Sequence, residues 1–462
     1  MPDDYQDCLD FLYGRLNYER LGMPRHPGEL RLGRMRRLLR LLGDPHEQLR
    51  IVHVAGTKGK GSTSAMLAAA LTASGRRTGQ FCSPHLHRLE ERFTVDGRAA
   101  TCDELVALTA AVRPAVAILD ADTVRHWRRG PTFFEITTAM GLLHFVRRGA
   151  DVVVLEVGLG GRLDSTNVVR PVLSVVTSIS FDHTKLLGST LGAIAAEKAG
   201  ILKRGTPAVS GVDAPEARAT IERVAAARRV PLRQLGRDFR YDYEPPAQPL
   251  CGPTAGRVTV RTWRTDWRTL DLPLFGAHQA QNAAVALASL DVLAERGLEV
   301  SQADVARGFA ALRWPARVEV VGQDPWIVID GAHNVASAEA LAETLRSCFP
   351  PVSRTLVFGT TRDKDLRGQL RALLPQFDKV IATRYLENPR SVAPEEVVDA
   401  VRELNGPEAW LAPGPSEALE LARRLTRVDG LICVTGSLFL AAEARAVLLG
   451  RDDPSPTRPA LT

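Results

Sequence analysis

Residues 51–74 of the chain read IVHVAGTKGKGSTSAMLAAALTAS and predict a strand, a glycine-rich turn and a helix in direct succession. A β-prone run opens the stretch, glycines interrupt it, and Ser62 suits the cap of the Ala- and Leu-rich segment that follows. Glycines allow successive backbone N–H groups to face one anion, and a helix N-terminus adds partial positive charge. The stretch therefore predicts a phosphate cradle, with Lys60 within reach of the terminal phosphates of a nucleotide.

The turn departs from the strict phosphate-binding pattern G-x-x-x-x-G-K-[ST] at two positions. Val54 stands where the first glycine belongs, and Gly61 separates Lys60 from Ser62. A glycine-rich turn without a ligand therefore remains open as an alternative for these residues taken alone.

Length and composition indicate a globular protein with two domains, because 462 residues exceed what one core usually supports. The net charge of +6 is spread over many segments without a basic stripe between aromatic residues, so we expect no nucleic-acid partner. The six cysteines lie far apart without a CxxC pair, which predicts free thiols in a reducing compartment. The first residues, MPDDYQDCLDFLYGRL, are acidic where a signal peptide is basic, and no apolar run approaches the length of a membrane span. We therefore expect a cytoplasmic protein without a membrane partner.

Polar side chains stand at the ends of three predicted strands. Lys60 follows the first strand, Glu156 lies near the end of the β-branched run at 151–157, and His183 follows the apolar run at 172–179. Ligands of open parallel sheets bind outside the carboxyl ends of the strands. The sequence therefore predicts that these three side chains meet at one edge of a sheet.

The rest of the chain alternates strands with helices and restarts this pattern near Trp314, which predicts two α/β domains. We expect a mostly parallel, doubly wound sheet with a small antiparallel sheet at 232–275 in residues 1–312, and a Rossmann-like domain in 313–450. A disordered tail is expected at 451–462. The helices that we predict lie at 103–119, 133–147, 189–199, 276–293, 335–348, 365–374, 394–404, 416–426 and 438–448. The strands predicted for the second domain lie at 326–330, 355–359, 379–383 and 431–435.

Ten short motifs carry a resemblance to a known family. They are GTKGKGS at 56–62, SPHL at 83–86, TFFE at 132–135, LEVGLGGRLDSTN at 155–167, DHTKLLG at 182–188, EKAGI at 197–201, HQAQNAA at 278–284, WPAR at 314–317, DGAHN at 330–334 and DKD at 363–365. With these motifs in this order, the chain resembles the folylpolyglutamate synthase and dihydrofolate synthase family of the Mur ligase superfamily. The resemblance implies a P-loop-type ATPase domain, a glutamate-ligase domain and a monomer.

The activity implied by the resemblance is an ATP-dependent ligation of L-glutamate to dihydropteroate, to a reduced folate, or to both. The acceptor carboxylate takes the γ-phosphoryl group of ATP, and the glutamate amine attacks the acyl phosphate to give ADP and phosphate. Formation of an amide from a free carboxylate is uphill in water, and phosphorylation supplies a better leaving group. Another Mur-type ligase of cell-wall precursors and an inactive nucleotide-binding regulator remain as alternatives.

The resemblance also implies roles for individual residues. Those implied for the nucleotide are Gly56, Thr57, Gly59, Lys60, Gly61, Ser62, Thr63, Asn282, Arg317, Asp330 and His333. Those implied for the substrates are Phe134, Glu135, Asp182, Asn334 and Lys364. Purely structural roles remain as alternatives for several of them: a helix cap for Asn282, turn formation at 330–334, and a solvated loop for Lys364.

Two Mg²⁺ sites complete what the resemblance implies, with Lys60, Glu156, His183 and Lys198 as the catalytic set. Ser83 and Glu156 are expected at one ion, and His183 and a CO₂-derived carbamate on Lys198 at the other. Only a neutral amine forms a carbamate, so burial or a nearby cation must lower the pKa of Lys198 from about 10.4. A structural histidine and an ordinary exposed lysine are the alternatives for His183 and Lys198.

The sequence departs from the family pattern at three places. Lys58 stands where the family commonly has Asn, HRLEER at 87–92 departs from the usual residues after SPHL, and Val335 replaces a common proline. None of these changes removes an expected phosphate or metal ligand. They leave the preferred acceptor open.

Overall fold

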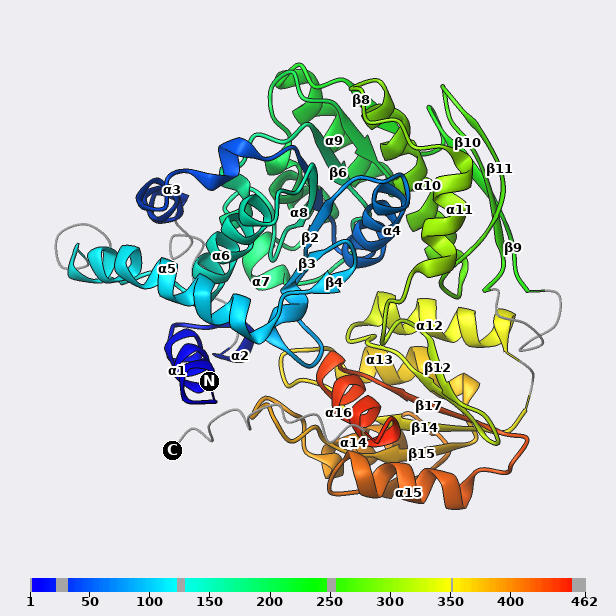
Figure 1. The fold of residues 1–462 in the computed structure, drawn as a ribbon. Helices are drawn as coiled ribbons and strands as arrows, with labels where there is room; N and C mark the ends of the chain where they lie inside the picture. The colour runs from blue at the N-terminus through cyan, green and yellow to red at the C-terminus, as the bar shows by residue number, and fades with distance from the viewer. Residues whose placement is uncertain (1, 22–31, 123–128, 247–254, 350–351, 451–462) are drawn as a thin grey trace. The chain divides into compact units, whose positions relative to one another are not determined.

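The structure is a computed structural model that describes residues 2–21, 32–122, 129–246, 255–349 and 352–450. The chain divides into two compact units (Figure 1). The first unit comprises Met1–Asp242, Val258–Leu270 and Ala280–Leu312, and the second comprises Tyr243–Arg257, Asp271–Gln279 and the chain from Arg313 onward. The tail predicted at 451–462 lies outside the described residues. Among the described helices, none combines the length and apolar character that a membrane crossing requires.

The first unit is built on an eight-stranded sheet of order β4-β3-β2-β5-β1-β6-β7-β8. Its strands are β1 (Ile51–Ala55), β2 (Thr78–Phe81), β3 (Phe93–Val95), β4 (Arg98–Ala99), β5 (Val152–Glu156), β6 (Leu173–Val176), β7 (Ala208–Ser210) and β8 (Leu232–Gln234). All pairings from β2 to β8 are parallel, whereas β3 and β4 pair antiparallel. The mostly parallel, doubly wound sheet predicted from the sequence is confirmed.

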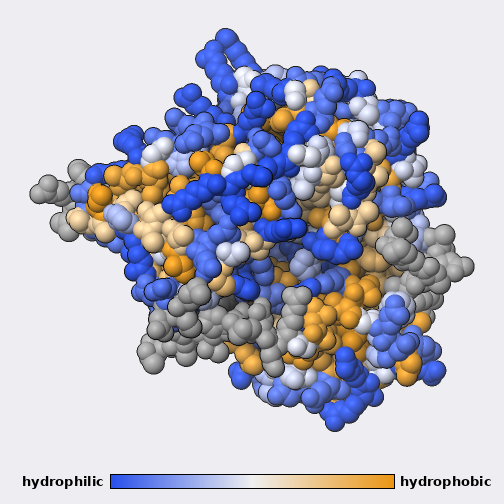
Figure 2. All heavy atoms as spheres, in the orientation of Figure 1, coloured by the Kyte–Doolittle hydropathy of each residue, from blue (hydrophilic) through white to orange (hydrophobic). Residues whose placement is uncertain are grey.

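Helices flank this sheet and supply its apolar cores. They are α1 (Pro2–Tyr13), α2 (Tyr18–Leu21), α3 (Leu32–Leu41), α4 (Lys60–Ala73), α5 (Cys102–Ala121), α6 (Phe133–Arg147), α7 (Thr184–Leu187), α8 (Leu191–Lys198), α9 (Pro215–Ala227), α10 (Ala277–Ala294) and α11 (Gln302–Ala311). One core joins α1, α3, α5 and α6 to residues of β1, β2, β3 and β5, and another joins α8 and α9 to β6 and β7. On the face seen in Figure 2, hydrophilic side chains predominate with apolar ones among them, as is normal for folded proteins.

The prediction of antiparallel strands throughout 232–275 is wrong at its start. β8 pairs in parallel with β7, with Leu232 opposite Ala208, and forms the edge of the main sheet. In the described part of the chain, the small sheet consists of β9 (Arg240–Glu244), β10 (Arg257–Arg261) and β11 (Asp266–Asp271). An alternating sequence does not show which neighbour a strand will pair with, because both kinds of edge strand bury one face.

The second unit is built on a six-stranded sheet of order β12-β13-β17-β14-β15-β16. Its strands are β12 (Glu319–Gly322), β13 (Trp326–Ile329), β14 (Arg354–Phe358), β15 (Lys379–Ala382), β16 (Glu408–Leu411) and β17 (Leu431–Thr435). Its helices are α12 (Val335–Cys348), α13 (Leu366–Leu373), α14 (Pro394–Glu403), α15 (Pro415–Leu425) and α16 (Leu438–Leu448). Among the described strands of this sheet, only β12 pairs antiparallel, so the second α/β domain expected from the sequence is confirmed.

Candidate functional site

The glycine-rich turn between β1 and α4 is fastened to the chain that follows β6. Thr57 donates its backbone N–H to the Ser178 carbonyl oxygen at 2.7 Å. The Lys58 carbonyl oxygen accepts hydrogen bonds from Thr177 Oγ1 at 2.6 Å and from Ser178 Oγ at 3.0 Å. A Cβ on Gly56 would lie 1.9 Å from Thr177 Oγ1, so only glycine permits this close approach. The turn is therefore held in one conformation by its neighbours.

The start of α4 has the properties of an anion site. Gly59, at φ 79, occupies the N-cap position and has no side chain with which to cap the helix. The hydroxyl of Thr63 is buried and has no hydrogen-bond partner within the described part of the chain. A phosphate placed here would meet the uncapped N–H groups and the positive end of a helix dipole.

Two lysine side chains share one backbone acceptor in this turn. Lys60 Nζ donates to the Gly56 carbonyl oxygen at 3.1 Å, and Lys198 Nζ donates to the same oxygen at 2.9 Å. Two ammonium groups that contact one oxygen are close enough to repel each other strongly. Lys60 and Lys198 are 138 positions apart in the sequence, so no local pattern predicts this contact.

Lys198 is almost completely buried at the C-terminal end of α8. Burial, and then the charges of Lys60 and Lys58, lower the pKa of Lys198 to about 7, against the opposing effect of Asp182 and Asp164. The alternative of an ordinary exposed lysine is therefore wrong. The amine meets the condition for carbamate formation, since a large share of it is neutral at pH 7.

A second glycine-rich loop, at 158–161, packs against the end of α8. A Cβ on Gly161 would lie 2.9 Å from the Lys198 carbonyl oxygen, so the two backbones are in contact. Buried Asp164 fixes the loop by accepting hydrogen bonds from Leu159 N at 2.8 Å and Thr166 Oγ1 at 2.6 Å. Burial raises the pKa of Asp164. Sequence reasoning assigned no role to this residue, although its place after the glycines of LEVGLGGRLDSTN marked it.

The other expected metal ligands lie at the same edge of the sheet. Ser83 follows β2, Glu156 ends β5, and His183 follows β6, and these parallel strands flank β1 within one sheet. Glu156 is 5% exposed and stands opposite Val54, directly before the turn. The ends of these three strands thus lie at one edge of the sheet. The oxygen atoms of Ser83 and Glu156 suit Mg²⁺, whereas the imidazole nitrogen of His183 is an unusual ligand for that ion. Among the described residues, no three His, Cys, Asp or Glu side chains cluster as a metal site on their own.

Asp182 and His183 form a strained corner beside the turn. His183, with φ 50, is in the left-handed conformation, and Asp182 Oδ1 accepts its backbone N–H at 3.0 Å. Lys58 Nζ lies 3.1 Å from Asp182 Oδ2, so the lysine that departs from the family pattern makes an ion pair across the site. The His183 side chain is 23% exposed, which is more than a core histidine shows.

Asn282 reaches the phosphate turn from α10. A Cβ on Gly59 would lie 2.1 Å from Asn282 Oδ1, so the amide side chain occupies the space above that glycine. The helix-cap alternative for Asn282 is wrong, because α10 begins at Ala277 and Asn282 lies inside it.

The TFFE motif at 132–135 starts α6 and divides its side chains between two environments. Phe134 faces the second glycine loop, where its ring lies 2.4 Å from a Cβ built on Gly158. Glu135 instead forms a buried ion pair with Arg34 at 2.8 Å and accepts the Thr132 N–H at 2.8 Å as a helix cap. The carboxylate expected at the substrate is thus occupied by structural partners.

In the second unit, Asp330 and Arg317 lie close together at the end of β13. Asp330 accepts backbone N–H groups of Val318 at 2.9 Å and Ala332 at 2.8 Å. Burial raises the pKa of the Asp330 carboxyl, and the Arg317 guanidinium opposes that effect. The two backbone hydrogen bonds to Asp330 stabilise the turn that follows β13.

The remaining expected residues of the second unit have separate surroundings. His333 Nδ1 lies 2.9 Å from the Gly331 carbonyl oxygen. Asn334 caps α12 by accepting the Ser337 N–H at 3.0 Å, so a structural role accounts for its amide. Lys364 lines a hollow of about 390 Å³ together with Arg362 and Asp365.

The chain is similar to known proteins over most of its length. Residues 54–290 match the family described as Mur ligase middle domain, and residues 316–438 match Mur ligase, glutamate ligase domain. The dihydrofolate synthase/folylpolyglutamate synthase of Bacillus subtilis is 34% identical over 443 residues, which cover 96% of this chain and 98% of that protein. The folylpolyglutamate synthase of Lacticaseibacillus casei is 38% identical over 416 residues, which cover 89% of this chain and 93% of that one. The structure of Mycobacterium tuberculosis folylpolyglutamate synthase complexed with ADP aligns with a TM-score of 0.88 at 33% identity, covering 97% of this chain and 99% of that chain.

Proposed function

The chain belongs to the folylpolyglutamate synthase/dihydrofolate synthase family of Mur ligases, and from that premise we propose how its residues carry out the reaction. It is an ATP-dependent carboxylate–amine ligase that adds L-glutamate to dihydropteroate, to a reduced folate, or to both. The acceptor carboxylate attacks the γ-phosphorus of ATP, ADP leaves, and the glutamate amine then displaces phosphate from the acyl phosphate. The residues must hold nucleotide, acceptor and glutamate together and keep water out.

The phosphate turn carries this proposal. Lys60 and Lys198 meet at the Gly56 carbonyl oxygen, at the uncapped start of α4. We expect Lys60 to leave this carbonyl for the β- and γ-phosphates, since a phosphate oxygen is a stronger acceptor than a carbonyl oxygen. Backbone N–H groups from Gly59 to Thr63 would bind the same phosphates, and Asn282 would fix the turn from above.

Two Mg²⁺ ions fit the donors at the sheet edge. Ser83 and Glu156 would hold one ion, and His183 together with a carbamate on Lys198 would hold the other. Bound Mg²⁺ would neutralise the negative charge of the phosphates. Two observations support this proposal: the parallel strands end at one edge of the sheet, and Lys58 and Asp182 form an ion pair beside the turn.

The carbamate proposal follows from the environment of Lys198. With a pKa of about 7, roughly half of the amine is neutral at pH 7, whereas an ordinary lysine is neutral in only about one molecule in a few thousand. The neutral nitrogen attacks CO₂, a C–N bond forms, and one proton leaves. This step turns a buried neutral amine beside Lys60 into an anion, and so places opposite charges next to each other.

The experiment that tests the function measures phosphate release from ATP with glutamate and either dihydropteroate or tetrahydrofolate. We expect release that depends on both the acceptor and glutamate. Turnover only with a muramyl nucleotide would assign the chain to cell-wall ligation, and tight ATP binding without turnover would assign it to regulation. The same assay with each acceptor decides between the two folate activities.

A further inference from the structure

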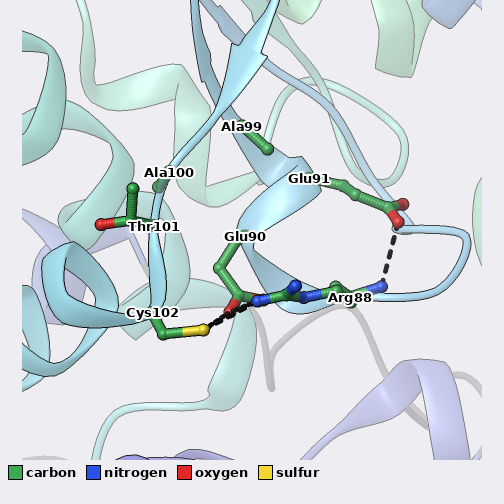
Figure 3. A pocket seen from close by; sticks show the side chains of 7 residues that line it. All are labelled: Arg88, Glu90, Glu91, Ala99, Ala100, Thr101 and Cys102. Carbon is green, nitrogen blue, oxygen red and sulfur yellow. Dashed lines mark hydrogen bonds and ion pairs between the residues drawn. The ribbon is translucent and has the colours of Figure 1, made fainter. Parts of the chain in front are cut away.

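A second pocket, of about 380 Å³, lies between the segment that follows β2 and the start of α5 (Figure 3). It is lined by Arg88, Glu90, Glu91, Ala99, Ala100, Thr101 and Cys102. None of the residues proposed for the ligation lines it. Its volume is at the small end of ordinary ligand pockets, which suits a molecule of the size of an amino acid.

The pocket contains a fixed cation and a carboxylate with one unused oxygen. Arg88 Nη2 donates to Glu90 Oε1 at 2.9 Å, and the hydrogen bond to Glu90 raises the pKa of Arg88, which keeps it cationic. Tyr5 donates its hydroxyl to the same Oε1 at 2.8 Å. The Glu90 side chain is only 2% exposed. Its second oxygen, Oε2, is buried and has no hydrogen-bond partner among the described residues. A buried carboxylate oxygen without a donor is costly, so this atom indicates a ligand that brings one.

The same pocket contains a cysteine whose sulfur lies between a guanidinium and a carboxylate. Cys102 Sγ lies 2.8 Å from Arg88 Nη2 and 3.6 Å from Glu90 Oε1, and Figure 3 shows the three side chains turned toward one another. Cys102 is also the first residue of α5, a helix of 20 residues whose N-terminus carries partial positive charge. Cys102 is partly exposed, whereas the other described cysteines, Cys8, Cys82, Cys348 and Cys433, are buried.

We propose that Cys102 is a site of reversible thiolation by the disulfide of a small zwitterionic aminothiol, of which cystine is the simplest. The Cys102 thiolate attacks one sulfur of the small disulfide, that S–S bond breaks, and a new S–S bond joins Cys102 to one half. The other half leaves as a thiolate and takes up a proton. In the adduct, the α-ammonium group donates to Glu90 Oε2, and the α-carboxylate accepts from the Arg88 guanidinium.

The test compares three small disulfides that carry different charged groups. Each labelling rate is divided by the rate at which the same disulfide reacts with free glutathione, because the leaving thiols differ in pKa. The full-length protein is incubated at neutral pH with cystine, with cystamine, which lacks the carboxylates, or with 3,3′-dithiodipropionate, which lacks the ammonium groups. Peptide mapping by mass spectrometry follows the Cys102 peptide separately from that of Cys251, which lies outside the described residues. Cystine should label Cys102 about tenfold faster than either partial analogue, because it makes one more charged hydrogen bond, and such a bond corresponds to a factor of about ten. Equal rates for the three reagents, or no labelling at Cys102, would overturn the proposal.

Substitutions at the two charged residues separate recognition from simple thiol reactivity. Glu90→Gln should abolish the preference for cystine over dithiodipropionate, and Arg88→Gln should abolish the preference for cystine over cystamine. Cys102→Ser is the unlabelled reference, and thermal unfolding identifies any variant that is not folded. Glu90→Gln tests the ammonium contact and Arg88→Gln tests the carboxylate contact. Because these tests are independent, one variant that folds is enough. A folded variant that keeps its full preference contradicts the assigned contact.

Discussion

At the scale of single residues, the most consequential contact is the Gly56 carbonyl oxygen with its two lysine donors. Burial, and then the charge of Lys60, lower the pKa of Lys198. The same turn thus holds Lys60, which we propose binds phosphate, and the buried amine of Lys198, which we propose forms the carbamate. Their different environments give two lysines different chemical roles.

Lys198→Ala should lower ligation at least about a hundredfold, because the anion expected at the second metal is gone. Lys198→Arg should not restore activity, since a guanidinium forms no carbamate. Added short-chain carboxylic acids should partly rescue the alanine variant by supplying an anion, and should leave the wild type unchanged. Steady-state phosphate release measures all three; full activity of the alanine variant would refute the role.

Lys198 also makes a pH-dependent contribution to the free energy of unfolding. Its pKa is about 7 in the folded state and about 10.4 in the unfolded chain, so between these values the unfolded state binds more protons and stability rises with pH. Below pH 7 the buried charge destabilises the fold by at most about 5 kcal/mol. Lys198→Met should therefore be more stable than wild type at pH 6, with the difference shrinking toward pH 10. Urea unfolding in CO₂-free buffer tests this, and a difference that does not change with pH would contradict it.

At the scale of elements, the site depends on how parallel strands end and how helices begin. β2, β5, β1 and β6 are neighbours in the sheet, so the chain segments that leave them meet at one edge. α4 then begins at that edge without a side-chain cap, and α8 ends beside it with Lys198. The arrangement of strands and helices brings the turn and Lys198 to the same edge, and glycines allow close contact between the neighbouring backbones.

Gly59→Ala should lower ATP affinity by about tenfold or more, because its Cβ would meet Asn282 Oδ1 at 2.1 Å and displace the turn. Gly75→Ala is the matched control: its φ of 86 is similarly left-handed, but nothing lies within 4 Å of the added Cβ. Both variants should lose about 1 kcal/mol of stability from backbone strain. Calorimetric ATP titration distinguishes them, and equal affinities in the two variants would be inconsistent with the steric account.

Glu135 provides a test of structure against substrate binding. Glu135→Ala and Arg34→Ala should each destabilise the fold by about 3–5 kcal/mol, since each leaves a buried charge without its partner. Denaturant unfolding measures this loss, and KM for the acceptor should stay unchanged in the folded fraction. A raised KM in Glu135→Ala alone, with little loss of stability, would instead place this carboxylate at the substrate.

The sequence predicted the elements of the site more completely than their contacts. Glycines, β-branched runs and polar strand ends are local signals, which is why the turn, Glu156 and His183 could be found at one sheet edge. The pairing of Lys58 with Asp182, the closure of the second loop by Asp164, and the Arg34 partner of Glu135 join distant segments. No local pattern carries that information, because such pairings are set by packing. The parallel pairing of β8 escaped prediction for the same reason.

At the scale of the whole molecule, the chemistry assigns complementary tasks to the two units. The first unit contains the phosphate turn and the sheet edge, and the second contains Arg317, Asp330 and His333 at the end of its own parallel strand. An acyl phosphate hydrolyses if water reaches it before the amine does, so the residues that hold the nucleotide and the substrates must also keep water away from it. This acyl phosphate is the central claim of the account.

The measurement that tests this claim most directly follows oxygen from the acceptor into phosphate. Dihydropteroate or tetrahydrofolate, whichever is turned over, is labelled with ¹⁸O in the accepting carboxylate and incubated with ATP and glutamate. An acyl phosphate requires that one labelled oxygen from each acceptor molecule leaves with the phosphate, which mass spectrometry of the phosphate detects. Labelled phosphate in step with amide formation is the predicted result, and unlabelled phosphate with full amide formation would contradict the account.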